Sequence, residues 1–374
     1  MRFTISSTAL SSKLLSLSRV INSKNTLSIL DCFLFEAKDN QLFITASDRE
    51  NVMRTTLNLD SIEGDGVFAV NNRNILDAVK ELPEQPLTID VNISELKMYV
   101  SYQNGSYSFP IVDANEYPQT PPLEENATTI SIEAGCLSDN LTRSLFATAQ
   151  DELRPAMNGV YFDLKEDCLT IVATDGQKLV RNRNTAIKGE VPAAFILPKK
   201  PASLLKGVLA KESGDVVIKF DARSAEISFA EGSLTCRLIE GKYPNYNGVI
   251  PKDNPHHIVI DRKTLIGGIR RVLPFANDAS QLIRFHIENG QLDLNTEDVD
   301  FSTSAKESIT CDYNGTAMSI GLKGPNMLDI LNNLQGDDIN IQLADPSRAV
   351  VIFPSTQEET EETLMVIMPA LLNY

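Results

Sequence analysis

The chain has 374 residues, of which 42% are hydrophobic and 22% are charged, and this composition is typical of a folded globular protein. A single hydrophobic core stops growing at about 250–300 residues, so the length predicts two or three domains. The formal net charge of −16, taken alone, argues against a nucleic-acid-binding protein. Because binding follows the local field rather than the total charge, the position of the charges along the chain has to be considered as well.

The sequence gives no sign of a membrane or secreted protein. No apolar run approaches the roughly 20 residues of a membrane-spanning helix, and the first residues, MRFTISSTALSSKLL, lack the apolar core of a signal peptide. The cysteines are odd in number and form no C-x-x-C pair, so we expect bystander thiols in a reducing compartment. They are Cys32, Cys136, Cys168, Cys236 and Cys311. We therefore expect a cytoplasmic protein.

The first third of the chain predicts strands, two helices and a linker, in a definite order. A short strand leads into a helix over 9–24, a hairpin follows over 31–48, and a second helix is predicted over 71–81. Strands then follow at LTIDV, KMYVSY and YSFPIV. The stretch PQTPPLEENATT, at 118–129, is proline-rich and polar and predicts an extended linker.

The same order of elements returns twice. The hairpin DCFLFEAKDNQLFITASD is followed by NGVYFDLKEDCLTIVATD and then by QLIRFHIENGQLDLNTED, so that Asp48, Asp175 and Asp298 end three similar segments. A long internal period indicates a repeated structural unit. The later helices are predicted over 136–150, 198–211, 263–276 and 323–334, and a second linker at 251–257.

The repeat predicts an α+β fold with three similar domains, each with two helices backed by antiparallel strands. Their predicted ranges are 1–120, 121–252 and 253–374.

Basic residues are concentrated in the predicted helices. The six helical segments hold fourteen Lys and Arg against four Asp and Glu, a net charge of +10, so the rest of the chain carries −26. One explanation is that the helices simply solvate their outer faces, but helices accept Glu as readily as Lys or Arg. We expect the helices to form a positive surface that contacts phosphates without reading base sequence.

The sequence carries no motif for catalysis. It has no P-loop, no G-x-G-x-x-G, no G-x-S-x-G and no H-E-x-x-H. His256 and His257 are expected in the second linker and His286 in a strand, as surface or filler residues rather than metal ligands. The three repeated aspartates lie one per domain, too far apart for a catalytic pair, and are expected to cap turns. We therefore expect no enzyme activity, no metal and no cofactor.

Three motifs carry a resemblance to a known family. The segments ATDGQKL (173–179), EGKYPNY (240–246) and VIMPALLNY (366–374), together with the threefold repeat, resemble the bacterial DNA sliding clamp, the beta subunit of the replicative DNA polymerase III. The resemblance implies a processivity factor: a head-to-tail homodimeric ring that encircles double-stranded DNA without sequence specificity. The implied partners are the polymerase catalytic subunit, the clamp loader, and other replication and repair proteins with short apolar clamp-binding motifs.

The resemblance also implies site residues. The family's partner groove between the second and third domains matches Met157, Thr174, Gly176, Gln177, Lys178, Leu179, Pro244, Val249, Met368, Pro369, Ala370 and Leu371. Its DNA contacts match Lys24, Arg73 and Gln150, and charge alone adds Lys199 and Lys200. Its subunit interface matches Tyr107 and Phe109 against Val272 and Leu273.

Two other classes of protein remain possible from the residues. One is a monomeric adaptor that binds only protein partners, which gel filtration would reveal as a single chain with no dependence on DNA. The other is a hydrolase that uses scattered carboxylates, which metal-dependent turnover would reveal. For each groove residue taken separately, ordinary core or turn packing is the competing explanation.

Overall fold

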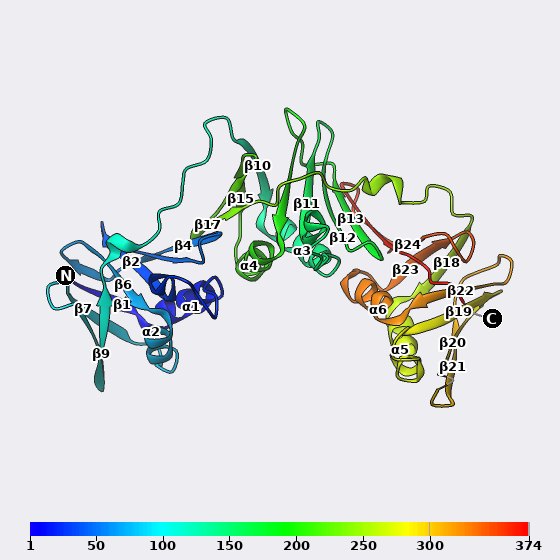
Figure 1. Cartoon of the computed structure of the whole chain (residues 1–374), viewed down its shortest axis with the longest axis horizontal. Coiled ribbons are helices and arrows are strands. Elements are labelled where there is room, and N and C mark those ends of the chain that lie inside the picture. The colour runs from blue at the N-terminus through cyan, green and yellow to red at the C-terminus, as the bar shows by residue number, and fades with distance from the viewer. Residues whose placement is uncertain (299, 373–374) are drawn as a thin grey trace. The chain divides into compact units, whose positions relative to one another are not determined.

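The structure is a computed structural model that describes residues 1–298 and 300–372 (Figure 1). Asn373 and Tyr374, which end the third quoted motif, lie outside the described residues. The chain divides into two compact units, one formed by residues 1–138 and 203–238 and the other by residues 139–202 and 239–374. The three predicted domain ranges remain a prediction.

The first unit is built on one antiparallel sheet of thirteen strands. Helices α1 (Ser7–Ser18) and α2 (Asn72–Val79) pack side by side against it (Figure 1). In chain order its strands are β1 (Arg2–Ser6), β2 (Cys32–Lys38), β3 (Gln41–Ser47), β4 (Asn51–Asn58), β5 (Ser61–Glu63), β6 (Gly66–Asn71), β7 (Pro86–Asn92), β8 (Lys97–Tyr102), β9 (Gly105–Val112), β10 (Thr128–Glu133), β15 (Asp215–Phe220), β16 (Ser224–Phe229) and β17 (Gly232–Arg237).

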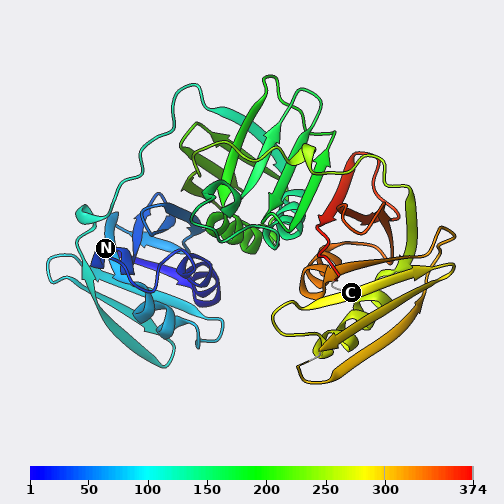
Figure 2. The ribbon, with the colours of Figure 1, turned by 45° about the vertical axis from the view of Figure 1, so that its right-hand side comes forward.

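The second unit holds an eight-stranded and a four-stranded sheet. The eight-stranded sheet contains β11 (Gly159–Leu164), β12 (Leu169–Thr174), β13 (Lys178–Asn184), β14 (Ala193–Pro198), β18 (His256–Asp261), β23 (Asp338–Leu343), β24 (Val350–Pro354) and β25 (Glu361–Ile367). The four-stranded sheet contains β19 (Leu282–Glu288), β20 (Gln291–Asp298), β21 (Thr303–Thr310) and β22 (Met318–Lys323). Helix α5 (Arg262–Val272) packs on one face of this smaller sheet (Figure 2), and α6 (Gly324–Asn333) packs beside α5.

Helices α3 (Ala134–Leu145) and α4 (Lys199–Leu209) have residues in both units, and two helices per repeat are confirmed. The predicted apolar stripe of α5 is also confirmed, because Leu265, Ile266, Ile269 and Val272 are all buried. Side-chain caps explain where helices begin. Asp261, for example, accepts a hydrogen bond from the Thr264 amide at 2.7 Å and satisfies one of the unpaired donors at the start of α5.

The three repeated aspartates cap turns, as predicted. The Oδ1 atom of Asp48 accepts from the Glu50 and Asn51 amides, at 3.0 and 2.7 Å. The Oδ1 atom of Asp175 accepts from the amides of residues 177 and 178, at 2.8 and 2.9 Å. The Oδ1 atom of Asp298 accepts from the amides of residues 300 and 301, at 2.9 and 3.2 Å. The repeat in sequence is thus a repeat of one hydrogen-bonded turn.

Two predictions about the elements were wrong. His256 and His257 lie in β18 rather than in the linker, because β18 pairs with β23 from its first residue. The helices are also shorter than predicted, since Arg19, Lys24, Lys80 and Lys211 follow helix ends and Lys323 precedes α6. The observed helices hold ten basic and three acidic residues, so the basic bias survives with the shorter bounds.

Strand pairing joins successive repeats into continuous sheets. Strand β4 pairs with β17, and β13 pairs with β25, both antiparallel. The equivalent strand of the third repeat, β21, is at the edge of its sheet and has no second partner among the described residues. In β9, residues 105–110 pair only with β8 in the part of the chain that the structure describes, so their outer edge is open.

Candidate functional site

The second unit contains a groove of about 400 Å³. Nine of the twelve predicted groove residues line it: Met157, Thr174, Gly176, Gln177, Lys178, Leu179, Pro244, Val249 and Met368. Four further lining residues were missed by the sequence reasoning: Arg154, Asn245, Tyr246 and Val366. Tyr246 and Asn245 stand in the quoted motif EGKYPNY, so the signal for these two was present and only Pro244 was taken from it.

Apolar side chains form both the floor and the mouth of the groove. Leu179 of β13 lies directly opposite Val366 of β25, and both are buried. Met157, in the short 3-10 helix Pro155–Asn158, is also buried. Val249 and Met368 are 53% and 45% exposed, which leaves apolar surface facing solvent at the mouth. Such a surface favours a ligand with apolar anchors.

The Asp175 turn shapes one wall of the groove. Gly176 has φ +89°, a conformation that favours glycine, and an added Cβ would meet an Arg154 side-chain nitrogen at 3.2 Å. Thr174 Oγ1 accepts from the Gly176 amide at 3.1 Å and donates to the Lys178 carbonyl at 2.8 Å. Main chain and side chains together therefore fix this turn.

Charged groups at the groove are held by partners outside the apolar floor. The Lys178 ammonium pairs with Asp175 at 2.9 Å and with Asp329 of α6 at 3.5 Å, which ties the turn to the third repeat. Arg154 donates to Asp151 at 2.8 Å, and this hydrogen bond is the main reason that the pKa of Asp151 lies below its ordinary value. The polar residues thus frame the groove without filling it.

A tyrosine cluster fixes the segment that carries Tyr246. The rings of Tyr161 and Tyr243 stack with centroids 4.5 Å apart, and the Tyr246 hydroxyl donates to Asp163 at 2.7 Å. Burial, followed by the hydrogen bond to Asp163, raises the pKa of Tyr246, so its phenol stays protonated and can keep donating. This wall of the groove is therefore preorganised.

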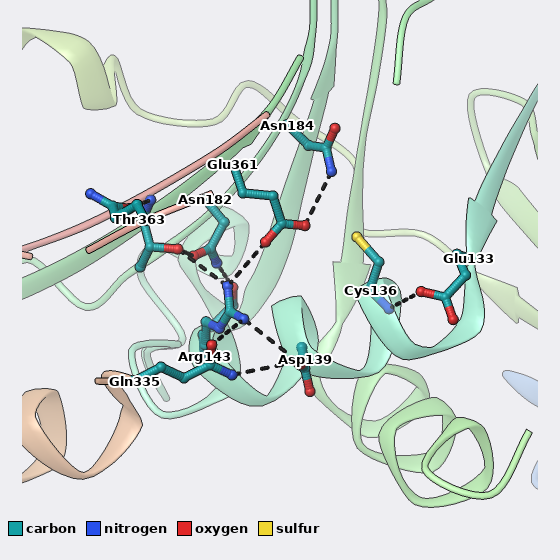
Figure 3. A network of polar contacts seen from close by, with 11 residues as sticks. Glu133, Cys136, Asp139, Arg143, Asn182, Asn184, Gln335, Glu361 and Thr363 are labelled. Carbon is teal, nitrogen blue, oxygen red and sulfur yellow. Dashed lines mark hydrogen bonds and ion pairs between the residues drawn. The ribbon is translucent and has the colours of Figure 1, made fainter. Parts of the chain in front are cut away.

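A buried arginine holds the strand pair beneath the groove (Figure 3). Arg143 of α3 reaches Thr363 at 3.3 Å and Glu361 at 3.6 Å on β25, and Gln335 beyond α6 at 3.0 Å. Thr363 in turn donates to Asn182 of β13 at 2.9 Å. Since β13 and β25 supply Leu179 and Val366, this network positions the groove floor from the opposite end of the same strands.

Three predicted groove residues lie beyond the groove lining. Past Met368, the chain bonds to β22, where the Ala370 amide donates to the Gly321 carbonyl at 2.9 Å. A Cβ on Gly321 would come within 2.6 Å of the Ala370 oxygen, so glycine permits this close approach. Pro369 is half-buried and Leu371 is 81% exposed. The pairing with β22 directs these residues away from the groove floor.

The predicted DNA contacts fall in both units. In the first unit, Arg73 lines a mostly polar hollow of about 420 Å³ whose other lining residues are Ser18, Ile21, Asn22, Ser23, Asp31, Asn71 and Asn72, and exposed Lys24 follows this lining. In the second unit, Gln150 is exposed in the loop after α3, and Lys199 and Lys200 begin α4.

The helix starts are electrostatically unusual. None of the six α-helices that the structure describes has an acidic residue in its first turn, where acids are favoured, and α2, α4 and α5 have basic residues there. Carboxylates of Glu84, Glu133 and Asp261 already accept hydrogen bonds from the first amides of α1, α3 and α5, so α2 and α4 are the basic helix N-termini that suit a phosphate.

The predicted interface residues are partly corrected. Tyr107 and Phe109 are half-buried on β9, with ring centroids 6.1 Å apart. Val272 is only 1% exposed and packs in the core beneath α5, so its side chain is not available to a second chain. Leu273 is partly buried against the same core. Phe275, two residues further on, is 42% exposed.

In residues 1–298 and 300–372, no group of three or more His, Cys, Asp or Glu side chains is arranged to hold a metal ion. The ring nitrogens of the histidines contact neighbouring polar groups, with His286 2.9 Å from Ser319 and His256 3.1 Å from the Tyr313 hydroxyl. Within the same described ranges, no helix has the length and apolar character needed to cross a bilayer.

Comparison with known families covers nearly the whole chain. Residues 1–121, 131–245 and 247–369 match the N-terminal, central and C-terminal domains of the DNA polymerase III beta subunit, respectively. The chain belongs to the DNA polymerase III beta subunit family. It has the three-domain sliding-clamp fold, with antiparallel sheets and helices.

Individual relatives agree. The chain is 27% identical over 373 residues to the beta sliding clamp of Pseudomonas putida, with both chains fully covered. A crystal structure of the Pseudomonas aeruginosa sliding clamp bound to griselimycin has a TM-score of 0.94 at 26% identity, again with full coverage of both chains. The Thermotoga maritima beta subunit has a TM-score of 0.90 at 25% identity and the same coverage.

We expect Met368→Asp to abolish binding of a peptide with Leu and Phe anchors to the groove. The change places a carboxylate at the apolar mouth, where burial without a partner costs several kcal/mol, so the anchor stays in water. Isothermal titration calorimetry measures the loss. Val191→Asp is the matched control, because residue 191 is an exposed apolar side chain of the same unit and lies outside the lining. Equal affinity of the Met368→Asp variant and the parent would show that the groove is misplaced.

Proposed function

We propose that this chain is a DNA polymerase processivity factor that closes into a ring around duplex DNA and tethers the polymerase through the groove of the second unit. The observation that carries the proposal is the preformed apolar groove, found in a chain whose family and fold are those of the beta sliding clamp. In this proposal the chain catalyses no reaction and acts in the cytoplasm.

The groove suits short segments of many partners. It offers apolar floor residues and two exposed apolar side chains at its mouth, which a Leu or Phe side chain can cover. Proposed occupants are segments of the polymerase catalytic subunit, the clamp loader, and replication and repair proteins. Two chains in one ring would offer two grooves and so raise the effective concentration of a second partner at the DNA.

Sequence-neutral contact with DNA is supported by the helices. Their ten basic and three acidic residues, and their acid-free first turns, favour phosphates rather than base edges. The strongly negative remainder of the chain would repel DNA elsewhere. Lys24, Arg73, Gln150, Lys199 and Lys200 are the proposed contacts.

Ring closure is supported by the repeat. Val112, Ile239 and Ala370 each lie opposite the fourth residue of an equivalent strand, namely Ala69, Ile196 and Gly321. Counting five residues back from each gives Tyr107, Leu234 and Met365, which are therefore equivalent positions. Likewise Met53, Val180 and Ala305 are equivalent, because each pairs with the residue two positions before a repeated aspartate.

The two junctions within the chain show how these positions pair. Met53 lies opposite Leu234 in one junction, and Val180 lies opposite Met365 in the other. Strand β21 has no partner for a third junction among residues 1–298 and 300–372, so the repeat predicts that Ala305 pairs with Tyr107 of a second chain. A head-to-tail dimer would place both open edges in sheets, as exposed edges require. The short 3-10 helix Leu273–Phe275 contacts β21, so Leu273 and Phe275 are further proposed residues of this subunit contact.

The proposed function is tested by topology. We expect the protein, once loaded by its clamp loader onto a nicked circular duplex, to stay bound through gel filtration and to leave when a restriction enzyme cuts the circle, because a closed ring can slide off only at an end. Retention on the linear product with free ends would contradict the ring.

Reversing Lys24 and Arg73 to Glu should weaken binding to short duplexes equally for every base sequence. Each lost phosphate contact should reduce the slope of log affinity against log salt by about 0.9. Fluorescence anisotropy at several salt concentrations measures both effects. The matched control reverses Lys242 and Lys252, two exposed loop residues outside the helices, with the same change in net charge. A base-sequence preference in the parent, or an equal loss in the control, would count against this assignment.

The strand register at the subunit contact can be tested by cross-linking. Directly opposite residues have Cβ atoms about 4.5–5.5 Å apart, so Tyr107→Cys with Ala305→Cys should give a covalent dimer under mild oxidation, seen by denaturing electrophoresis. Ser106→Cys with Ala305→Cys is the control, because residue 106 points to the other face of the strand. A sample that sediments as a dimer and yet fails to cross-link would contradict the register.

A further inference from the structure

The first unit contains a second groove, of about 500 Å³, which none of the functions above uses. It lies between the turn after β3, the proline-rich segment that precedes β10, and the ends of β16 and β17. Its lining residues are Ser47, Arg49, Glu50, Val52, Pro118, Gln119, Thr120, Pro121, Pro122, Glu124, Asp221, Arg223, Ser224, Thr235, Cys236 and Arg237.

This groove has the same backbone framework as the apolar groove. The Arg237 amide donates a hydrogen bond to the Glu50 carbonyl at 2.9 Å. In the apolar groove, the Met368 amide donates to the Gln177 carbonyl at 2.8 Å. Val52 lies opposite Thr235 just as Leu179 lies opposite Val366. The two grooves therefore occupy equivalent positions in successive repeats.

The chemistry of the second groove is different, because arginines replace small or apolar residues. Arg49 stands at the position of Gly176, and Arg237 at that of Met368. Arg223, directly before β16, has an arginine, Arg348, at its equivalent position, because Ala225 pairs with Cys236 as Val350 pairs with Ile367. All three arginine side chains are exposed, and Thr235 replaces the apolar Val366 at the floor. A Leu or Phe anchor would find no apolar pocket here.

One of these arginines is kept in spite of an unfavourable backbone. Arg49 has φ +80°, close to the +89° of Gly176 at the equivalent position. Left-handed backbone is costly for a residue with a Cβ, and such costs concentrate at functional positions. Arg49 therefore carries its guanidinium on a turn of the same shape as the Gly176 turn.

Three acidic residues also line the groove, and they limit what can bind. Asp221 already accepts hydrogen bonds from the amides of Arg223, Ser224 and Glu124, at 2.7, 2.8 and 3.2 Å. Glu50 and Glu124 are exposed. Their carboxylates disfavour the continuous, evenly spaced charge of a phosphate backbone. The glutamate side chains of an extended peptide are flexible, so some carboxylates can reach the guanidinium groups while the others turn to solvent, away from Glu50 and Glu124.

We propose that this second groove binds an extended peptide segment of a partner protein that carries Asp or Glu side chains. Guanidinium groups bind carboxylates through paired, charge-assisted hydrogen bonds, which gives both affinity and orientation. Pro118, Pro121 and Pro122 hold one wall in an extended form, so little ordering is required on binding. The chain would thus offer an acidic-peptide groove in addition to its apolar one.

The test uses the full chain and a fluorescein-labelled hexaglutamate peptide, followed by anisotropy. The triple variant Arg49→Gly, Arg223→Ala and Arg237→Met removes all three guanidinium groups, and at positions 49 and 237 it installs the residues of the equivalent positions in the other repeat. It should weaken hexaglutamate binding by about tenfold or more, since it removes three charge-assisted contacts. The variant with Lys24 and Arg73 reversed to Glu is the control, and it should bind hexaglutamate as the parent does.

Unchanged binding of a peptide with Leu and Phe anchors shows that the triple variant is folded. The single change Arg49→Gly, which relieves the backbone, should weaken hexaglutamate binding in the same direction. The proposal is overturned if hexaglutamate does not bind the parent, if the triple variant binds it as well as the parent does, or if the loss occurs in the Lys24 and Arg73 variant instead. It is also overturned if a short DNA duplex, and not the peptide, responds to the triple variant. Because no step requires a ring or a polymerase, failure here is separate from failure of the proposed function.

Discussion

Backbone pairing between successive repeats is the interaction on which the rest of this structure depends. In each junction a strand that follows a repeated aspartate, β4 or β13, adds to the sheet of the next repeat through β17 or β25. Hydrogen bonds between main chains fix both register and direction, whatever the side chains are. A groove lies at each of the two junctions, and each is bordered by the aspartate-capped turn and by a proline-containing segment, 118–124 in one and 244–249 in the other.

This arrangement separates scaffold from chemistry. The hydrogen bonds of the aspartate-capped turn, and those donated by the Arg237 and Met368 amides, have nearly equal lengths in the two junctions. The side chains at equivalent positions differ, for example Arg237 in one groove and Met368 in the other. A single substitution can therefore change what a junction binds without altering how it is built. The Arg143 network adds support from beneath at the junction that carries the apolar groove, where Thr363 and Asn182 join the two strands a second time.

The features predicted well from the sequence are those that local physics decides. Aspartate caps, tight turns and the apolar stripe of α5 depend on neighbouring residues, and all are present. The groove residues came mostly from motif resemblance, and nine of twelve line the observed groove. Features that depend on distant chain segments were missed. Pairing with β23 placed His256 in a strand, contact with β22 directed Ala370 away from the groove, and the core beneath α5 enclosed Val272. No periodicity within a short window reports such contacts.

The distribution of charge follows from the same division between local and long-range effects. Lys199 and Lys200 begin a helix whose dipole disfavours them, and local stability would prefer Asp or Glu there. In the proposed complex with DNA, a phosphate would be stabilised by both these lysines and the N-terminus of α4. The strain at Arg49 follows the same logic in the second groove, where a guanidinium stands on backbone suited to glycine. In both places, the proposed ligand would offset a local cost of the residue that binds it.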